Sequence, residues 1–130
     1  MKHHPSADYL LQSFAYRQRL KTRGDSDGML IVPGKHGHIY QHDEQGLAVL
    51  VMPLQLRARF WNLTRRRLTS LGFELIQDGD CEGAAIFAPC NPEQARAAIK
   101  AAGIKRKRRI SPAQVNRQLT WLRASAGGAL

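Results

Sequence analysis

Apolar residues recur along this chain of 130 residues with two different periods, which separate expected helices from expected strands. From Ala7 to Lys21 the apolar spacing is that of one helix face, with Ser6 and Asp8 able to cap its start and Gly24 able to end it. We therefore expect a first helix over this range, whose inward side chains are Ala7, Leu10, Leu11 and Phe14.

Three short runs follow, Met29 to Val32, His38 to His42 and Leu47 to Met52, and the residues between them have the length and composition of hairpin turns. This pattern predicts an antiparallel meander. The first and third runs are almost wholly apolar, so we expect both of their faces to be covered. The middle run alternates and should keep one face in water.

A long amphipathic helix is expected from Leu54 to Leu71, because Pro53 can open it and Gly72 stands where a left-handed cap is expected. At about 100° per residue, the outer face is predicted to carry Arg59, Asn62 and Arg66, with Arg65 at its edge. The inward face is predicted to consist of Leu56, Phe60, Leu63, Thr64, Leu68 and Leu71.

The rest of the chain predicts a second hairpin, Phe73 to Gln77 with Ala84 to Ala88, and two more helices. Asn91 as cap and Pro92 at the first helical position begin one helix, which Gly103 ends and which packs closely through Ala95, Ala98, Ile99 and Ala102. Ser111 and Pro112 repeat this signal before a last helix with Val115, Leu119 and Leu122 on one face.

The expected fold is therefore α+β, with the order α-βββ-α-ββ-α-α and an antiparallel sheet packed by helices. We expect the whole chain, 1–130, to form one domain. Within it we distinguish a compact core over 6–104, a basic linker over 105–110, a C-terminal helix over 111–124 and a frayed tail over 125–130.

Composition excludes several classes of protein. The chain is 43% hydrophobic and 23% charged, as in ordinary globular domains. Its longest apolar stretch, Leu47 to Leu54, is far shorter than the roughly 20 residues of a membrane span, and no apolar stretch follows the basic N-terminus. We therefore expect a cytoplasmic protein without a membrane partner, with Cys81 and Cys90 as thiols and with no cofactor.

Charge is the one skewed property. The net charge is +10, and two long stretches, 45–73 and 94–130, contain no acidic residue at all. Such stretches favour a polyanionic partner, because Lys and Arg neutralise phosphates and release condensed counterions. The alternative interpretation is a solvated surface whose charge keeps the protein in solution. The candidate nucleic-acid contacts are Arg59, Arg65, Arg66, Lys105, Arg106, Lys107, Arg108, Arg109, Lys35 and Tyr40.

Aromatic residues near these positions could stack on unpaired bases. Tyr40 is the best surface candidate, because it shares its expected strand face with His38 and His42. Trp61 and Trp121 are expected to pack in the core instead, since each lies beside the apolar face of its helix.

The histidines and the acidic turn suggest other chemistry only weakly. Alternate residues on a strand are about 7 Å apart, so His36, His38 and His42 do not converge on one metal ion. A histidine with Lys35 nearby could act as acid or base in cleaving RNA. Asp78, Asp80 and Glu82 lack the remaining ligands of a calcium loop and are expected to form a hairpin turn.

The expected order α-βββ-α of the first five elements resembles that of double-stranded-RNA-binding domains. Its βββ-α part also resembles small DNA-binding domains that place a three-stranded sheet in the major groove. The lysine cluster expected at the start of the second helix of the RNA-binding family is replaced here by Leu54, Gln55 and Leu56. The resemblance therefore lies in element order and implies nucleic-acid binding at that level.

These observations lead to three hypotheses. The first is a small, non-enzymatic protein that contacts the phosphate backbone of DNA or RNA through the arginine-rich helix face and the Lys105 to Arg109 segment. The second is a regulatory or inhibitory module whose basic surface binds an acidic protein. The third is a metal-independent ribonuclease that uses His36 or His38.

Overall fold

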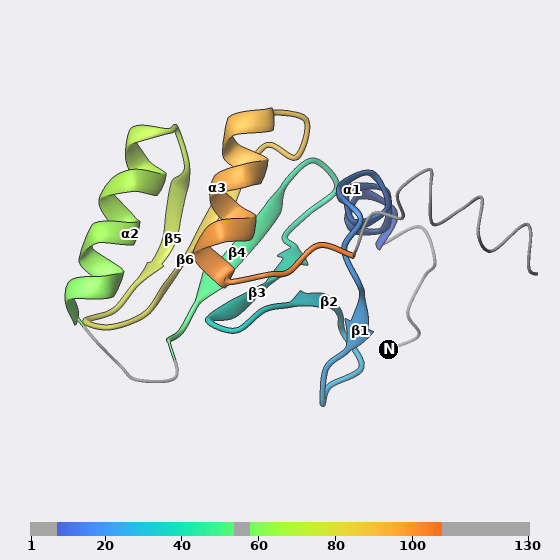
Figure 1. Cartoon of the computed structure of the whole chain (residues 1–130), viewed down its shortest axis with the longest axis horizontal. Coiled ribbons are helices and arrows are strands. Elements are labelled where there is room, and N and C mark those ends of the chain that lie inside the picture. Colours follow the sequence, from blue (N-terminus) through green and yellow to red (C-terminus); the bar gives the residue numbers. More distant parts are fainter. Residues whose placement is uncertain (1–7, 54–57, 108–130) are drawn as a thin grey trace, which may run out of the picture.

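Among the residues that the structure describes, six antiparallel strands form one sheet in the order β1-β2-β3-β4-β6-β5, and three helices pack against it (Figure 1). The computed structural model describes residues 8–53 and 58–107. The α+β class and the antiparallel sheet expected from the sequence are confirmed. The elements are α1 (Tyr9–Gln18), β1 (Arg23–Gly24), β2 (Leu30–Pro33), β3 (Gly37–Gln41), β4 (Leu47–Val51), α2 (Ala58–Ser70), β5 (Glu74–Asp78), β6 (Gly83–Phe87) and α3 (Pro92–Ala102).

The start of the chain differs from expectation in two ways. Helix α1 ends at Gln18, three residues before the predicted end, because Arg19 takes the left-handed conformation and its N–H returns to the last turn. The sequence also missed the short strand β1, which pairs Arg23 with Ile31. Two residues are too few to show a strand period, so pairing with β2 defines this strand.

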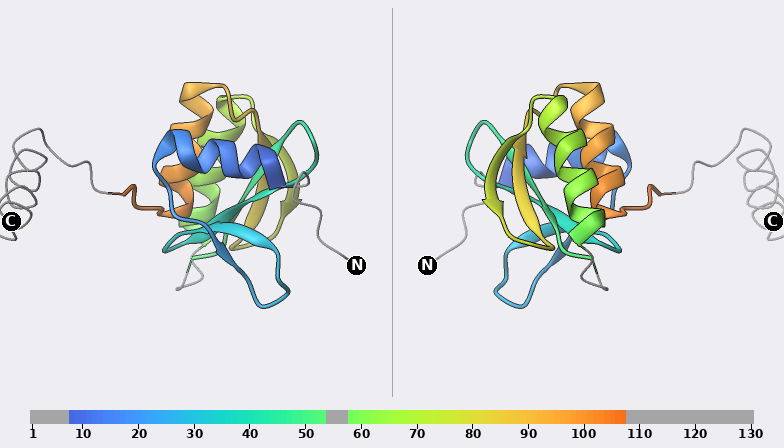
Figure 2. Two further views of the ribbon diagram at one scale, coloured as in Figure 1. Left: turned by 90° about the vertical axis from the view of Figure 1, so that its right-hand side faces the viewer. Right: turned by 90° about the vertical axis from the view of Figure 1, so that its left-hand side faces the viewer.

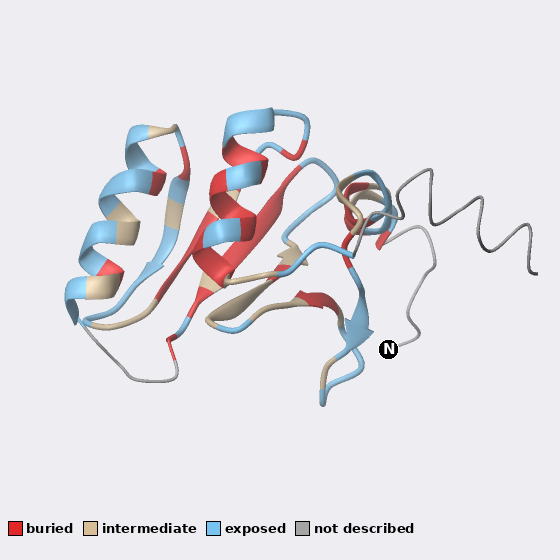
Figure 3. Ribbon diagram, viewed as in Figure 1, coloured by how far each residue is buried: buried red, intermediate tan, exposed pale blue. Residues whose placement is uncertain are grey.

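Strand β4 lies inside the sheet, between β3 and β6, and this position explains its unbroken apolar sequence. Leu47, Val49 and Val51 are fully buried in the core that the helices cover, and Figure 3 shows burial concentrated along β4 and the inward side of α3. Ala48 belongs to the opposite face, where its register partners Tyr40 and Ile86 flank it. Within the described part of the chain, no helix packs on that opposite face.

Helix α2 is rotated relative to the predicted orientation. Its buried residues are Trp61 and Leu68, whereas Leu63, expected to face inward, is 56% exposed. The rotation brings Trp61 to the inward face of the helix. Its cause is the close approach of the indole to Gly83 on β6, where any Cβ would meet the ring. The predicted first turn and Leu56 lie outside the described residues.

Helix α3 begins and ends where the sequence predicts. The Asn91 side chain accepts hydrogen bonds from the N–H groups of Glu93 and Gln94, and Gly103 ends the helix with a left-handed conformation. The Gln94 side chain is buried, accepts from the Ala88 N–H and donates to the Leu71 carbonyl. These bonds join α3 to the residue that follows β6 and to the residue that follows α2. The expected last helix, 111–124, lies outside the described residues.

Candidate nucleic-acid interface

Basic and acidic residues divide between the two layers of the molecule. The described helices and residues 103–107 contain one acid, Glu93, at the start of α3. The other acids precede α1 or lie in the sheet and its turns: Asp8, Asp25, Asp27, Asp43, Glu44, Glu74, Asp78, Asp80 and Glu82. The same helices and segment carry Arg17, Arg59, Arg65, Arg66, Arg67, Arg96, Lys100, Lys105, Arg106 and Lys107. The described basic residues outside this set are Arg19, Lys21, Arg23 and Lys35, so the helices and residues 103–107 carry most of the positive charge.

The arginines expected on the outer face of α2 have two different environments. Arg59 and Arg66 are exposed, as expected for residues that could reach a phosphate backbone. Arg65 instead forms an ion pair with Asp78 of β5, with 3.1 Å between Nη1 and Oδ2. Arg65 therefore has a partner within the fold, because the rotation of α2 turns its side chain toward the sheet edge, and its role as a nucleic-acid contact stays a prediction.

Asp78 holds α2 in that orientation through a second bond. The buried Trp61 indole N–H donates to Asp78 Oδ1 at 2.9 Å. This hydrogen bond, assisted by the bonds from Arg65, holds the pKa of the Asp78 carboxyl below its usual value. Asp78, expected in an acidic turn, is the polar anchor between α2 and β5.

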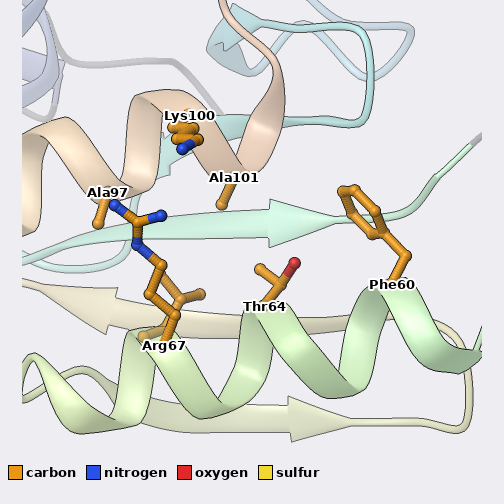
Figure 4. Close-up of a pocket in the computed structure, with 7 residues that line it drawn as sticks. Phe60, Thr64, Arg67, Ala97, Lys100 and Ala101 are labelled. Carbon is orange, nitrogen blue, oxygen red and sulfur yellow. The ribbon is translucent and has the colours of Figure 1, made fainter.

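A shallow groove of about 120 Å³ runs between α2 and α3 (Figure 4). Phe60, Leu68, Ala97 and Ala101 form its apolar lining, and Thr64, Arg67 and Lys100 supply its polar groups. Among the described residues, neither Arg67 nor Lys100 has an ion-pair partner. The sequence analysis did not single out these two cations, because only packing of α2 against α3 places them at the same groove.

Lys35 and the basic segment lie together although they are far apart in sequence. The Lys35 N–H donates to the Gly103 carbonyl at 3.1 Å, directly before the exposed residues Lys105, Arg106 and Lys107. This segment then contacts α1: the Arg106 guanidinium donates to Gln18 Oε1, and the Lys107 N–H donates to the Arg19 carbonyl. Arg108 and Arg109 lie outside the described residues.

The contact with α1 adds basic residues that the sequence analysis missed. Arg17 is exposed in the last turn of α1. Arg19 is the first residue after this helix, and Lys21, two residues further on, is exposed. The sequence feature that could have indicated them is a basic residue at every second position from Arg17 to Arg23. Only the return of the chain at residues 104–107 joins them to the basic segment.

Tyr40 lies apart from these cations. Its ring and that of His38 are neighbours, with centroids 5.8 Å apart, on the sheet face that the described helices leave uncovered. Burial raises the pKa of the Tyr40 phenol. It also lowers the pKa of the His38 imidazole, where nearby Asp25 and Arg23 act in opposite directions. Tyr40 shares a face with His38 as predicted, but the structure does not bring it to the helical arginines.

The two histidines named in the ribonuclease hypothesis, His36 and His38, lie on different sides of the sheet. The His36 ring packs on Phe60 of α2, with centroids 5.1 Å apart, and its Nδ1 atom is buried without a hydrogen-bond partner. His38 faces the other side of the sheet. The ribonuclease hypothesis uses either histidine by itself, so their placement on opposite sides of the sheet leaves it a prediction. In the described part of the chain, no group of three His, Cys, Asp or Glu residues could hold a metal ion.

Among the described helices, none combines the length and apolar character needed to cross a membrane. Comparison with known proteins finds no matching family model, no matching curated protein and no matching solved structure. The placement of charges and aromatic rings in this chain is therefore the guide to its function.

Proposed function

We propose that this protein binds nucleic acid through its helical side, with contacts made mainly to the phosphate backbone. The observation that supports this proposal is the uneven division of charge: the described helices and residues 103–107 carry ten cations and one acid, whereas the other described residues carry nine acids and four cations. A polyanion would be attracted to one side of such a molecule and repelled by the other, which orients its approach.

The proposed interface has two parts. The first is the outer surface of α2 and α3, with Arg59 and Arg66 exposed and Arg67 and Lys100 at the groove. The second is the segment 105–107 beside α1, together with Lys35. Contacts of this kind position a protein on nucleic acid without reading its sequence. We therefore propose binding with little base preference, in the cytoplasm, and without an enzymatic step.

The test is binding of labelled DNA and RNA oligonucleotides at several salt concentrations, measured by fluorescence anisotropy. The double variant Arg59→Gln/Arg66→Gln should weaken binding for all sequences alike. Each phosphate contact that is lost should make the log–log salt slope less negative by about 0.9 for B-form DNA or about 0.7 for single strands. The matched control is Arg23→Gln, an exposed arginine of the sheet, which should leave the slope unchanged.

Two results would contradict this proposal. One is the absence of binding by the wild-type protein at low salt to any oligonucleotide. The other is an unchanged affinity in the double variant with a loss in Arg23→Gln, which would move the interface to the sheet. If the helical arginines are instead needed to bind an acidic protein and nucleic acid does not bind, the alternative interaction-module hypothesis replaces this one.

A further inference from the structure

Helix α1 exposes two tyrosine rings on the side opposite its buried face. Tyr9 is 70% exposed and Tyr16 is 87% exposed, whereas Leu11 and Phe14 of the same helix are fully buried. Residues seven positions apart lie on the same face of a helix, about 10 Å apart along its axis. Tyr9 and Tyr16 therefore form one outward-facing pair, which we call the tyrosine face.

The basic segment meets α1 at the end where Tyr16 lies. The Arg106 side chain donates to Gln18 Oε1 at 2.9 Å, and the backbone of Lys107 is bonded to that of Arg19. Figure 2 shows α1 lying across the molecule, with residues 103–107 leaving beside its C-terminal end. Exposed Arg17 adds a further cation within the last turn of α1. No acidic residue occurs from Tyr9 to Gly24.

We propose that the tyrosine face binds unpaired bases, so that α1 and the neighbouring basic segment recognise single-stranded nucleic acid. This inference depends on the proposed nucleic-acid function and specifies its partner. Exposed rings beside cations are the combination by which proteins hold single strands: bases stack on the rings while the cations follow the backbone. Tyr9 and Tyr16 provide the rings, and Arg17, Lys105, Arg106 and Lys107 provide the cations.

The arrangement favours a single strand over a duplex. In a duplex the bases are stacked on one another, so a ring on an outward helix face would meet only the sugar–phosphate surface. The charge at the same place favours a nucleic acid over a neutral protein surface, because the four cations form no ion pair among the described residues and would remain unpaired against an apolar partner. The phosphates of a strand whose bases stack on the tyrosines would neutralise them.

The test compares three forms of the full-length protein. Tyr9→Ala/Tyr16→Ala removes both rings, Tyr9→Phe/Tyr16→Phe keeps them without the hydroxyl groups, and Ile76→Ala removes an exposed apolar side chain of β5 as the matched control. Affinity is measured by anisotropy for a single-stranded RNA, a single-stranded DNA and a duplex of the same sequence. Circular dichroism spectra and melting curves establish that each variant is folded.

We expect the alanine variant to bind single strands at least about fivefold more weakly, because stacking on one ring contributes on the order of 5- to 150-fold in affinity. Its duplex affinity should change less than about twofold. The phenylalanine variant and Ile76→Ala should bind like the wild type. Quenching of tyrosine fluorescence by single strands should accompany binding and be absent in the phenylalanine variant.

The outcomes separate this inference from the proposed function. If the alanine variant binds single strands like the wild type while Lys105→Gln/Arg106→Gln/Lys107→Gln does not, the protein binds nucleic acid but the tyrosine face is not used. Equal losses for single strands and duplex would overturn the assignment to unpaired bases. If the wild type binds no oligonucleotide, the proposed function and this inference both fail.

Discussion

At the scale of single residues, one carboxylate helps to hold the buried side of α2 against the sheet. Asp78 accepts a hydrogen bond from the Trp61 indole and two from Arg65, so an aromatic ring and a guanidinium both face β5. Without this acceptor, burial of the indole would leave its N–H unpaired, which destabilises a folded protein. Arg65, one turn after Trp61, is therefore structural. Arg59 and Arg66, on the far side of α2, have no ion-pair partner among the described residues.

The lowered pKa of Asp78 predicts a pH-dependent contribution to stability. An acid whose pKa is lower in the folded state stabilises the fold above its unfolded pKa, and this contribution is lost as the pH falls through the folded value. The variant Asp78→Asn keeps an oxygen that can accept from Trp61 but removes the charge. We expect it to melt at a lower temperature than the wild type near pH 7.

The difference in melting temperature should shrink toward zero as the pH is lowered past the pKa of Asp78 in the folded state. The control is Asp80→Asn, which changes a nearby exposed acid without a described bond to α2 and should show no such pH-dependent difference. A melting difference for Asp78→Asn that stays constant from pH 7 to pH 2 would show that the charge of Asp78 does not support the fold.

At the scale of elements, the exposed and buried leucines of α2 distinguish the observed orientation from the one the apolar pattern predicts. Leu68 is 1% exposed and lies beneath the groove to α3, whereas Leu63 is 56% exposed. The pattern placed both leucines on the inward face. A helix on a flat apolar surface would bury its most hydrophobic arc, but here the absence of a side chain at Gly83 draws Trp61 inward.

We therefore predict that Leu68→Ala lowers the free energy of unfolding by about 2 to 5 kcal/mol, because it removes fully buried methyl groups and leaves a cavity. Leu63→Ala, the matched control, should change it by no more than about 0.5 kcal/mol, as expected for an exposed position. Urea denaturation followed by circular dichroism measures both values. Similar losses in the two variants would mean that α2 packs through the face predicted from its sequence.

At the scale of the whole molecule, the basic segment connects parts of the fold that are distant in sequence. Residues 103–107 run from the end of α3, past Lys35, to the end of α1. The segment expected to be a linker is therefore hydrogen-bonded to the folded core at Arg106 and Lys107. This placement brings cations from α1, the β2–β3 turn and the segment itself into one region.

Replacing Lys105, Arg106 and Lys107 together by glutamine should leave the fold largely intact, because all three side chains are exposed. If each contacts one phosphate, the log–log salt slope of binding should become less negative by about 2.7 for B-form DNA or about 2.1 for single strands. Anisotropy titrations between low and moderate salt measure this slope. An unchanged slope would exclude the segment from the interface.

Part of the candidate site could be predicted from the sequence because it depends on local properties. Arg59 and Arg66 are exposed because they lie opposite the apolar residues of one helix, a relation fixed by about 3.6 residues per turn. The remaining contacts could not be predicted. Arg67 and Lys100 share a groove only because α2 packs on α3, and Tyr40 is separated from the arginines by the sheet itself.

The type and order of the described elements apart from β1, the limits of α3 and the excess of positive charge could all be predicted from local sequence. Each follows from neighbouring residues: the cap at Asn91, the left-handed Gly103, and the acid-free stretches. Which side of α2 is buried, which arginine is paired, and which cations and rings lie together follow only from the packing of the folded chain. These depend on contacts such as Trp61 with Gly83 and Arg106 with Gln18, whose partners are far apart in the chain and meet only in the folded state.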